Sequence, residues 1–432
     1  MDFTPSPLAH AMRERLTAFM DRYLLPYNAA WHQAQRAGEG PPPFLEDLKA
    51  LAREEGLWNL FLPTLAEDEP GTRLSNLDYA PLAEAMGRLS WASEVFNCQA
   101  PDTGNMELLH RFATPAQRTV WLQPLLEGRM RSAFAMSEPD VASSDPTQLQ
   151  TTVRRDGDQL RISGRKWFIT GAAHPLCRLL VVLCRHAPDQ ETDGDSAHAR
   201  HSMVLVPIDA PGVRIVRNIS VVHHHAPEGH CEILLQDVRV PTDHLLGAWG
   251  GGFAMAQARL GPGRVHHCMR TIGSCELALR LAAERALERT AFGKPLAEQA
   301  NVQEWLAESR IEIDQARLLV LHAAWILDQG DAADARAVRA QVAAIKLVAA
   351  RLQQRVMDRA MQVFGAMGLS PDTPLAAFWT WGRALRLMDG PDEVHLRSVA
   401  RHELAQARAT LGQWTEYFTT PEQLAAPPHL RA

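Results

Sequence analysis

Two short segments of the chain combine residue types that could bind a flat ligand with polar edges. The first, from Phe134 to Ser144, mixes small and hydroxyl residues around a proline. Such a segment leaves backbone N–H groups free, and its small side chains let a ligand come close. The second, from Lys166 to Ala172, places two aromatic residues beside the hydroxyl of Thr170. Together they could form a polar platform with aromatic walls.

The residues between these segments predict a β-hairpin. Apolar positions alternate with polar ones on both sides of the turn pair Asp156-Gly157, namely at Thr151, Val153, Leu160 and Ile162. Alternation on either side of such a turn pair is typical of a hairpin. The hairpin would return the aromatic segment to the hydroxyl segment. From local chemistry alone, an ordinary surface hairpin remains an open alternative.

A single acid near the C-terminal end of the chain is the other candidate for chemistry. Asp389 follows a helical stretch containing Trp379 and Trp381, and the Gly390-Pro391 pair then breaks the pattern. We place this acid at a helix end, at the pole where the helix dipole disfavours a negative charge. A carboxylate in such a position is a small functional hint.

Two conspicuous clusters are better explained without a ligand. The run His223 to His225, with His230 and Cys231 nearby, could suggest a metal. Adjacent residues in an extended segment point to opposite faces, and no carboxylate completes a familiar ligand spacing, so we expect no metal site. The run Gly250 to Gly252 lacks the Lys-Ser/Thr of a phosphate loop and is interpreted as the entry to a helix.

Composition limits the class of protein. A chain of 432 residues suggests two or three domains, and the formal net charge of −6 with no basic stripe argues against nucleic acid. No apolar run approaches the ~20 residues that span a membrane. The beginning of the sequence lacks a basic segment followed by an apolar run, so we expect no secretory signal. The six cysteines fit neither a zinc site nor a disulfide framework, which favours reduced thiols in a cytoplasmic protein.

Hydrophobic periodicity divides the chain into three parts. Residues 1–130 read as helical, with Ser75 and Thr114 as N-caps and a break at Pro41 to Pro43. Residues 131–245 change to strand patterns, including the buried run Leu179 to Cys184 and a polar loop from His186 to His201. Residues 246–432 return to long helices typical of an antiparallel bundle. One of these keeps an apolar face at Val338, Val342, Ile345, Val348, Leu352 and Val356.

The two segments of the hairpin region also resemble a known signature. Phe134-Ala-Met-Ser-Glu-Pro and Lys166-Trp-Phe-Ile-Thr are similar to the middle-domain motifs of the acyl-CoA dehydrogenase family, and the two segments in this order and at this separation are far more specific than either alone. The resemblance implies an α+β fold with a helical N-terminal domain, a middle β-barrel-like domain and a C-terminal four-helix-bundle domain. It also implies FAD as cofactor, held in this chain by Phe134, Met136, Ser137, Phe168 and Thr170.

The same resemblance extends into the C-terminal helices. Read alone, the segment from Arg289 to Leu296 is a capped helix and a turn. In the family, such a segment and a Gln-x-x-Gly-Gly segment contact the FAD of a neighbouring subunit. The implied cofactor residues here are Arg289, Phe292, Gln299, Gln362, Gly365, Ala366 and Glu393. Ala366 departs from the family's second glycine. The resemblance therefore implies a homodimer or homotetramer.

Asp389 falls where most members of the family place a catalytic glutamate. The resemblance assigns it the removal of the α-proton of an acyl-CoA thioester, with Ser143, Arg264, Gly390 and Arg401 as substrate contacts. Asp is one methylene shorter than Glu, roughly 1.5 Å of reach. Pro391 replaces a threonine that contacts flavin in relatives, and proline has no N–H to donate.

These observations predict an FAD-dependent acyl-CoA dehydrogenase of fatty acid β-oxidation, with electron-transferring flavoprotein as acceptor by family analogy. A flavin oxidase of the same superfamily, similar to nitroalkane oxidase or acyl-CoA oxidase, remains open because nitroalkane oxidases also use Asp as the base. A catalytically silent flavoprotein is a further alternative. Some relatives with an Asp-Gly-Pro-Asp-Glu motif act on 4-hydroxyacyl-CoA, so an oxygenated acyl chain also remains open.

Overall fold

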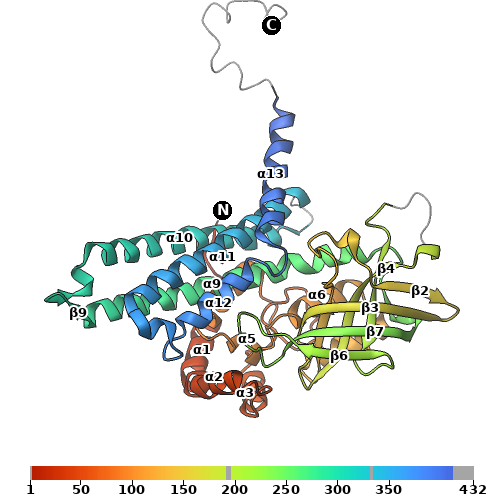
Figure 1. The fold of residues 1–432 in the computed structure, drawn as a ribbon, viewed down its shortest axis with the longest axis horizontal. Helices are drawn as coiled ribbons and strands as arrows, with labels where there is room; N and C mark the ends of the chain where they lie inside the picture. Colours follow the sequence, from red (N-terminus) through yellow and green to blue (C-terminus); the bar gives the residue numbers. More distant parts are fainter. Residues whose placement is uncertain (1, 191–195, 331–333, 412–432) are drawn as a thin grey trace, which may run out of the picture.

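The computed structural model describes residues 2–190, 196–330 and 334–411, and it places a mixed β-sheet beside a set of long helices (Figure 1). Short helices precede the sheet in sequence. Their bounds are α1 (Pro7–Phe19), η1 (Met20–Leu24), η2 (Leu25–Tyr27), α2 (Asn28–Ala37), α3 (Phe44–Glu54), α4 (Asn76–Met86), α5 (Ala92–Val95), α6 (Asp102–Phe112), α7 (Pro115–Gln117), η3 (Arg118–Leu122) and α8 (Gln123–Leu126). Of these, α4 packs against the long helices α9 (Gly252–Glu288) and α10 (Ala300–Asp328), and α6 contacts both α9 and the strand β1 (Arg131–Ala135).

The two predicted N-caps start helices as expected. The Ser75 hydroxyl accepts a hydrogen bond from the backbone N–H of Asp78 at 3.0 Å, at the start of α4. Thr114 and Gln117 form a reciprocal capping box at α7. The helical segment that Thr114 begins is interrupted by the π-helical η3, and α8 ends at Leu126.

The sheet contains eight strands of the described chain in the order β6-β7-β3-β2-β4-β5-β8, with β1 pairing β4. β1 and β2 both run parallel to β4, and the other pairs are antiparallel. The strands are β1 (Arg131–Ala135), β2 (Thr152–Asp156), β3 (Gln159–Thr170), β4 (Cys177–His186), β5 (His201–Pro207), β6 (Val213–Asn218), β7 (His230–Pro241) and β8 (Leu245–Leu246). The predicted buried run lies in β4, which is covered on both faces.

The predicted hairpin is formed by β2 and β3. Val153 pairs with Ile162, and Asp156 pairs with Gln159. The two residues outside this pairing are therefore Gly157 and Asp158, so the turn lies one residue later than predicted. Gly157 has a φ of +62°, the left-handed conformation that a tight hairpin turn needs. The predicted loop after β4 includes a short 3₁₀ turn, η5 (Pro188–Gln190), and residues 191–195 of it lie outside the described chain.

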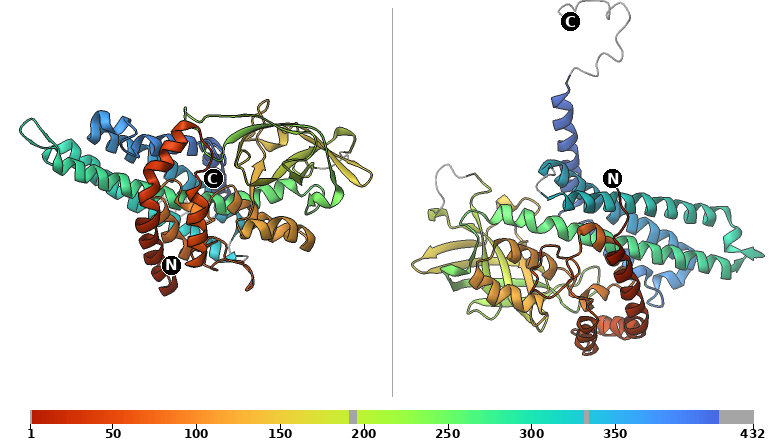
Figure 2. Two further views of the ribbon diagram at one scale, coloured as in Figure 1. Left: turned by 90° about the horizontal axis from the view of Figure 1, so that it is seen from below. Right: turned by 180° about the vertical axis from the view of Figure 1, so that it is seen from behind.

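Long helices form the C-terminal part, as predicted. α9, α10 and α11 lie side by side, and α13 extends away from the body in both Figure 1 and Figure 2. Their bounds are α9 (Gly252–Glu288), α10 (Ala300–Asp328), α11 (Ala335–Phe364), α12 (Leu375–Leu385) and α13 (Asp392–Ala409). A two-stranded hairpin, β9 (Thr290–Ala291) and β10 (Lys294–Pro295), joins α9 to the 3₁₀ turn η7 (Leu296–Glu298), and η9 (Gly365–Leu369) follows α11. The predicted combination of helical ends and a central sheet is confirmed.

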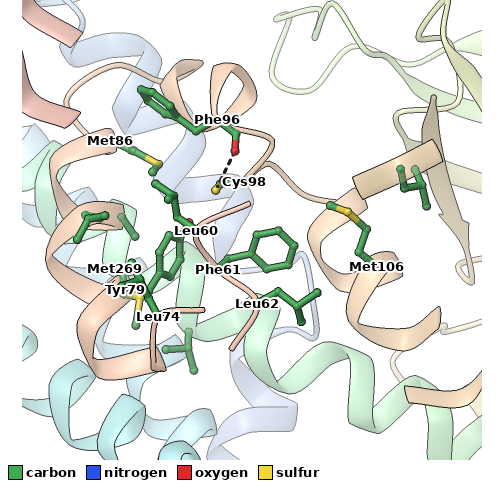
Figure 3. Packing of buried hydrophobic residues seen from close by; sticks show 14 of the residues in the cluster. Leu60, Phe61, Leu62, Leu74, Tyr79, Met86, Phe96, Cys98, Met106 and Met269 are labelled. Carbon is green, nitrogen blue, oxygen red and sulfur yellow. Dashed lines mark hydrogen bonds between the residues drawn. The ribbon is translucent and has the colours of Figure 1, made fainter. Parts of the chain in front are cut away.

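The N-terminal helices and α9 share one hydrophobic core. The same cluster contains Tyr79 of α4, Met269 of α9, and Phe61 from the segment between α3 and α4, and Figure 3 shows how closely these side chains pack. A second cluster fills the sheet, and a third lies between α9, α10, α11 and α12. Because α9 contributes to both helical clusters, it holds the N-terminal helices against the bundle. Within the described residues, no helix is both long enough and apolar enough to cross a membrane.

Candidate functional site

The structure brings the hydroxyl segment onto the hairpin. The segment continues from β1, and the carbonyl oxygen of Ser137 accepts a hydrogen bond from the backbone N–H of Trp167 at 3.0 Å. Phe134 lies in β1, where it pairs with Val181 of β4. The two parts of the motif, separated by the hairpin in sequence, therefore meet in space.

Lys166 also connects the two segments through hydrogen bonds of its side chain. Its side chain is fully buried, and its Nζ donates to the carbonyl oxygens of Met136 at 2.9 Å and Leu183 at 2.7 Å. It also donates to Oε1 of Glu138 at 2.9 Å. Burial lowers the pKa of Lys166, and the Glu138 carboxylate opposes this effect. A buried ammonium with three acceptors fixes the position of the loop after β1 relative to the strands β3 and β4.

The aromatic segment exposes one ring at the end of β3. Phe168 has a φ of +51° and 44% of its surface is exposed. A left-handed conformation is uncommon for such a residue, and strained conformations gather at functional sites. The Thr170 hydroxyl hydrogen-bonds Nδ1 of His230 at 2.9 Å. Burial lowers the pKa of His230 to about 4, so its ring is neutral and can accept this hydrogen bond.

Asp389 lies in the loop between α12 and α13, so the prediction that it ends a helix was wrong. α12 ends at Leu385, and α13 begins at Asp392. The carboxylate therefore stands just before the N-terminus of a helix, where the dipole favours a negative charge. Asp389 has a φ of +54°, the third predicted site residue after Phe168 and Phe292 with this uncommon backbone.

Side chains of α9 hold Asp389 from two directions. Nε of Arg264 donates to the carbonyl oxygen of Asp389 at 2.9 Å, and Nε2 of His267 lies 3.6 Å from its Oδ2. Burial raises the pKa of the Asp389 carboxyl, but four neighbouring side chains outweigh it and hold that pKa below its ordinary value. The largest of these effects comes from His267, followed by Arg264, Arg259 and Lys346. Asp389 is therefore a carboxylate at neutral pH.

Arg259 connects the three parts of the molecule. Its guanidinium donates to Oδ1 of Asn105 at 2.8 Å and to the carbonyl oxygen of Pro101 at 3.2 Å. It also lies 4.0 Å from the ring centre of Phe134 in β1. Burial lowers the pKa of Arg259 to about 10, which leaves it cationic at neutral pH. A positive charge thus sits between the hydroxyl segment and Asp389.

The predicted substrate contacts have different surroundings. The Ser143 hydroxyl accepts from the backbone N–H of Glu138 at 2.8 Å, so it closes its own loop. Gly390 has a φ of +101°, and an added Cβ would lie 3.1 Å from Nε2 of His395. Arg264 contacts the backbone of Asp389, as described above. Arg401 and Glu393 are exposed on α13.

Except for Glu393 on α13, the remaining predicted cofactor residues lie at the end of the helical bundle away from the sheet (Figure 1). Arg289 ends α9, Phe292 is at the tip of the β9–β10 hairpin, and Gln299 precedes α10. Gln362, Gly365 and Ala366 lie where α11 meets η9. The guanidinium of Arg285 is 5.6 Å from the ring centre of Phe364, so α9 and α11 bring these two groups to one end. Within a single chain, these residues at the end of the bundle do not reach the β2–β3 hairpin.

His267 and Lys346 were missed by the sequence interpretation. His267 follows Arg264 by three residues, so both lie on one face of α9, and that spacing was a usable signal. Lys346 follows Val342 by four residues within the apolar stripe of α11, where a lysine is unexpected. It is 1% exposed and donates to the carbonyl oxygen of Leu385 at the end of α12. In the described part of the chain no group of three or more His, Cys, Asp or Glu could hold a metal.

Comparisons with known proteins agree along the whole chain. The acyl-CoA dehydrogenase N-terminal, middle and C-terminal domain models match residues 6–129, 133–238 and 250–404. The chain is 53% identical to FadE2 of Mycobacterium tuberculosis, assigned as an acyl-CoA dehydrogenase, over 95% of this chain and 98% of that protein. It is 47% identical to mouse acyl-CoA dehydrogenase family member 10 over 92% of this chain, but it spans only 37% of that relative's length.

Solved structures give the same result. A Mycobacterium abscessus protein with the same assignment is 48% identical, with a TM-score of 0.87 over 93% of this chain and 99% of that chain. Butyryl-CoA dehydrogenase from Megasphaera elsdenii is 24% identical, with a TM-score of 0.79 over 94% of this chain and 100% of that chain, and shares the fold. The FAD complex of PigA is 22% identical, with a TM-score of 0.80 over 94% and 97%, and shares it too. The chain belongs to the acyl-CoA dehydrogenase family.

Proposed function

We propose that this protein is an FAD-dependent acyl-CoA dehydrogenase that converts an acyl-CoA thioester to the 2-enoyl-CoA, with Asp389 as the base. The observation that carries the proposal is the placement of Asp389. It is ionised, fixed at its backbone by Arg264, and located before the N-terminus of α13. A carboxylate held in this way can remove a proton from a substrate placed beside it.

The hairpin region fits the flavin of FAD. The exposed ring of Phe168 and the loop of Ser137 are held side by side by the hydrogen bond between Trp167 and Ser137. No described residue hydrogen-bonds the Ser137 hydroxyl, so it is free to bind a polar ring edge. Phe134, Met136, Ser137, Phe168 and Thr170 would hold the ring. Bound FAD would supply the acceptor for the hydride that leaves the β-carbon.

The residues of this chain prepare the substrate and take up the proton. An α-proton of a thioester is too weakly acidic for a carboxylate in open water. The site must therefore polarise the carbonyl and exclude water. The α13 N-terminus and Arg259 provide a positive environment for the negative charge that develops. The Asp389 side chain is 26% exposed in the ligand-free chain, so bound substrate and FAD would have to exclude the remaining water. Asp389 would then receive the proton on a carboxylate oxygen.

The remaining parts of the proposal concern partners and place. Arg289, Phe292, Gln299, Gln362, Gly365 and Ala366 lie away from the hairpin, which favours a homodimer or homotetramer in which they serve a neighbour's FAD. Electron-transferring flavoprotein is the proposed acceptor. A cytoplasmic role in fatty acid β-oxidation agrees with six free, buried cysteines.

The test is an anaerobic titration of the purified protein with a panel of acyl-CoAs. The yellow protein should lose its flavin absorbance with at least one of them. Reduced enzyme should reoxidise slowly in air and rapidly with electron-transferring flavoprotein. Rapid oxygen consumption with peroxide release would instead identify an oxidase, and bound FAD that no acyl-CoA reduces would contradict the proposal.

A further inference from the structure

Two adjacent histidines of α9 have very different surroundings. His266 is 1% exposed, and its ring packs edge-on against the rings of Phe61 and Tyr79. Neither of its ring nitrogens has a hydrogen-bond partner among the described residues. His267 is 8% exposed and has a polar group at each nitrogen. Its Nδ1 is 3.1 Å from a terminal nitrogen of Arg270, and its Nε2 is 3.6 Å from Oδ2 of Asp389. His266 is an ordinary core residue, and His267 is not.

Arg270 determines which nitrogen of His267 carries the proton. A guanidinium can donate hydrogen bonds and cannot accept them, so Nδ1 must accept and has no hydrogen. Arg270 is itself held by donation to the carbonyl oxygen of Cys98 at 3.2 Å, which limits its movement. The neutral ring therefore carries its hydrogen on Nε2, the nitrogen that faces Asp389.

The charges around this pair favour the same state. Burial and the nearby charge of Arg270 lower the pKa of His267 to about 4, although Asp389 opposes them. The other charged or titratable groups near the Asp389 carboxylate are Arg259 and Arg264 on α9, Lys346 on α11 and His395 on α13. Most of these are cations, so a second positive charge on His267 is disfavoured at neutral pH.

We infer that His267 is a positioning residue for the base: its Arg270-fixed Nε2–H is directed at Oδ2 of Asp389 and leaves Oδ1 to receive the substrate proton. This inference rests on the proposed function of Asp389. His267 cannot relay that proton, because Nε2 already carries a hydrogen and Nδ1 is occupied by Arg270. At 3.6 Å the contact is electrostatic, and such contacts in ligand-free sites commonly shorten when substrate binds.

The protonation of Asp389 can be measured without substrate. Infrared difference spectra between the FAD-loaded protein and its Asp389→Asn variant, recorded across pH, report the Asp389 carboxyl. His267→Phe keeps a ring but removes the N–H, so the midpoint for Asp389 should rise by about one pH unit. His267→Gln offers an acceptor to Arg270 and a donor to Asp389, and should stay near the parent value. His266→Phe is the matched control and should not move it.

A second variant tests the role of Arg270 and should shift the Asp389 midpoint in the opposite direction. Arg270→Met frees Nδ1, so His267 can become protonated on both nitrogens and stabilise the Asp389 carboxylate further. The Asp389 midpoint should then fall. An unchanged midpoint in His267→Phe, or a rise in Arg270→Met, would overturn the inference.

Flavin bleaching separates this inference from the proposed function. If the parent protein is bleached by an acyl-CoA, the acid limb of the bleaching rate should move upward in His267→Phe and stay in place in His266→Phe. If no acyl-CoA bleaches the parent protein, the proposed function fails, while the infrared midpoints still decide whether His267 controls Asp389. Should His267→Phe not bind FAD, Arg270→Met decides: a lower Asp389 midpoint supports the inference, and an unchanged or higher midpoint overturns it.

Discussion

The two ends of the helical bundle differ in how many of their charged and aromatic side chains find partners within this chain. Around Asp389, the charged groups have partners within the chain, and Arg264, His267 and Lys346 all contact that loop or its neighbours. At the opposite end, the aromatic ring of Phe292 is 100% exposed. An exposed aromatic in a left-handed turn serves no purpose in the isolated fold. The contrast supports the proposal that the catalytic end is complete within one chain and that a neighbouring subunit completes the distal end.

The largest effect is expected from removing the base at the finished end. Asp389→Asn keeps the shape of the side chain but cannot accept the α-proton, so the rate of flavin reduction by acyl-CoA should fall by about 10²–10⁴-fold. FAD content should be unchanged, which an absorbance spectrum of the purified variant checks. Stopped-flow bleaching measures the rate.

Two further variants sharpen this result. Asp389→Glu should also lose activity if the pocket is built around the shorter side chain, and should retain most of the rate if the loop can adapt. Glu393 is exposed on α13, so Glu393→Gln should have little effect on bleaching. Full bleaching in Asp389→Asn together with its loss in Glu393→Gln would transfer the role of the base to Glu393.

At the distal end, Phe292→Ala should weaken FAD retention without weakening the monomer. A buried aromatic anchor at an interface contributes about 2 kcal/mol or more, equivalent to roughly 30-fold in affinity. The measurement is FAD per chain after gel filtration, with the oligomeric state from the same run. Val120→Ala removes another exposed apolar side chain, in the N-terminal helices, and should change neither quantity. A stable monomer of the parent protein with stoichiometric FAD would remove the distinction between the two ends.

Acid should destabilise the fold through a buried histidine. Burial lowers the pKa of His174 to about 3, from an ordinary value of 6.5 that applies to the unfolded chain. The unfolded state then binds more protons below about pH 6.5, so stability is full above that pH and is lost as pH falls toward the folded-state pKa. His174 should contribute about 1.4 kcal/mol per pH unit to this loss.

Urea unfolding at a series of pH values between 7 and 5 measures that slope. His174→Asn keeps an acceptor near Nδ1 for the backbone N–H of Leu176 but cannot titrate, so the slope should decrease. A slope that His174→Asn leaves unchanged would contradict this role of His174.

The smallest effect is expected at Ser143. If its hydroxyl only closes the loop through Glu138, Ser143→Ala should reduce the free energy of unfolding by about 0.5–1.5 kcal/mol and leave the KM for acyl-CoA nearly unchanged. A tenfold or larger rise in KM would show that the residue contacts the substrate, as the family resemblance implies. Thermal unfolding and steady-state kinetics on the same preparation separate the two outcomes.

Local patterns predicted most of the architecture. The alternation at Val153 and Ile162 gave the hairpin, and the apolar stripe through Val342 gave α11. Caps at Ser75 and Thr114 also followed from short-range chemistry. The turn of the hairpin was misplaced by one residue, because Asp156-Gly157 and Gly157-Asp158 both suit a tight turn.

The surroundings of Asp389 could not be predicted in the same way. His267 and Lys346 reach that loop only because α9 and α11 pack beside it, and no short-range pattern contains this information. The end of α12 was also misjudged, since the sequence does not show where the helix stops before Gly390. Family resemblance supplied the position of the proposed base, and the structure supplied the charged groups around it.

The burial of lysine has a consequence for a protein that meets activated thioesters. Primary amines attack acyl thioesters and become acylated, which removes their charge. The sequence has only four lysines, and Lys49, Lys166 and Lys346 are 2%, 0% and 1% exposed. Lys294, in the hairpin at the distal end, is the exposed one. The folded chain thus carries almost all of its surface positive charge on arginine, which does not react in this way. Lys294 is therefore the one exposed lysine side chain that an acyl-CoA could acylate.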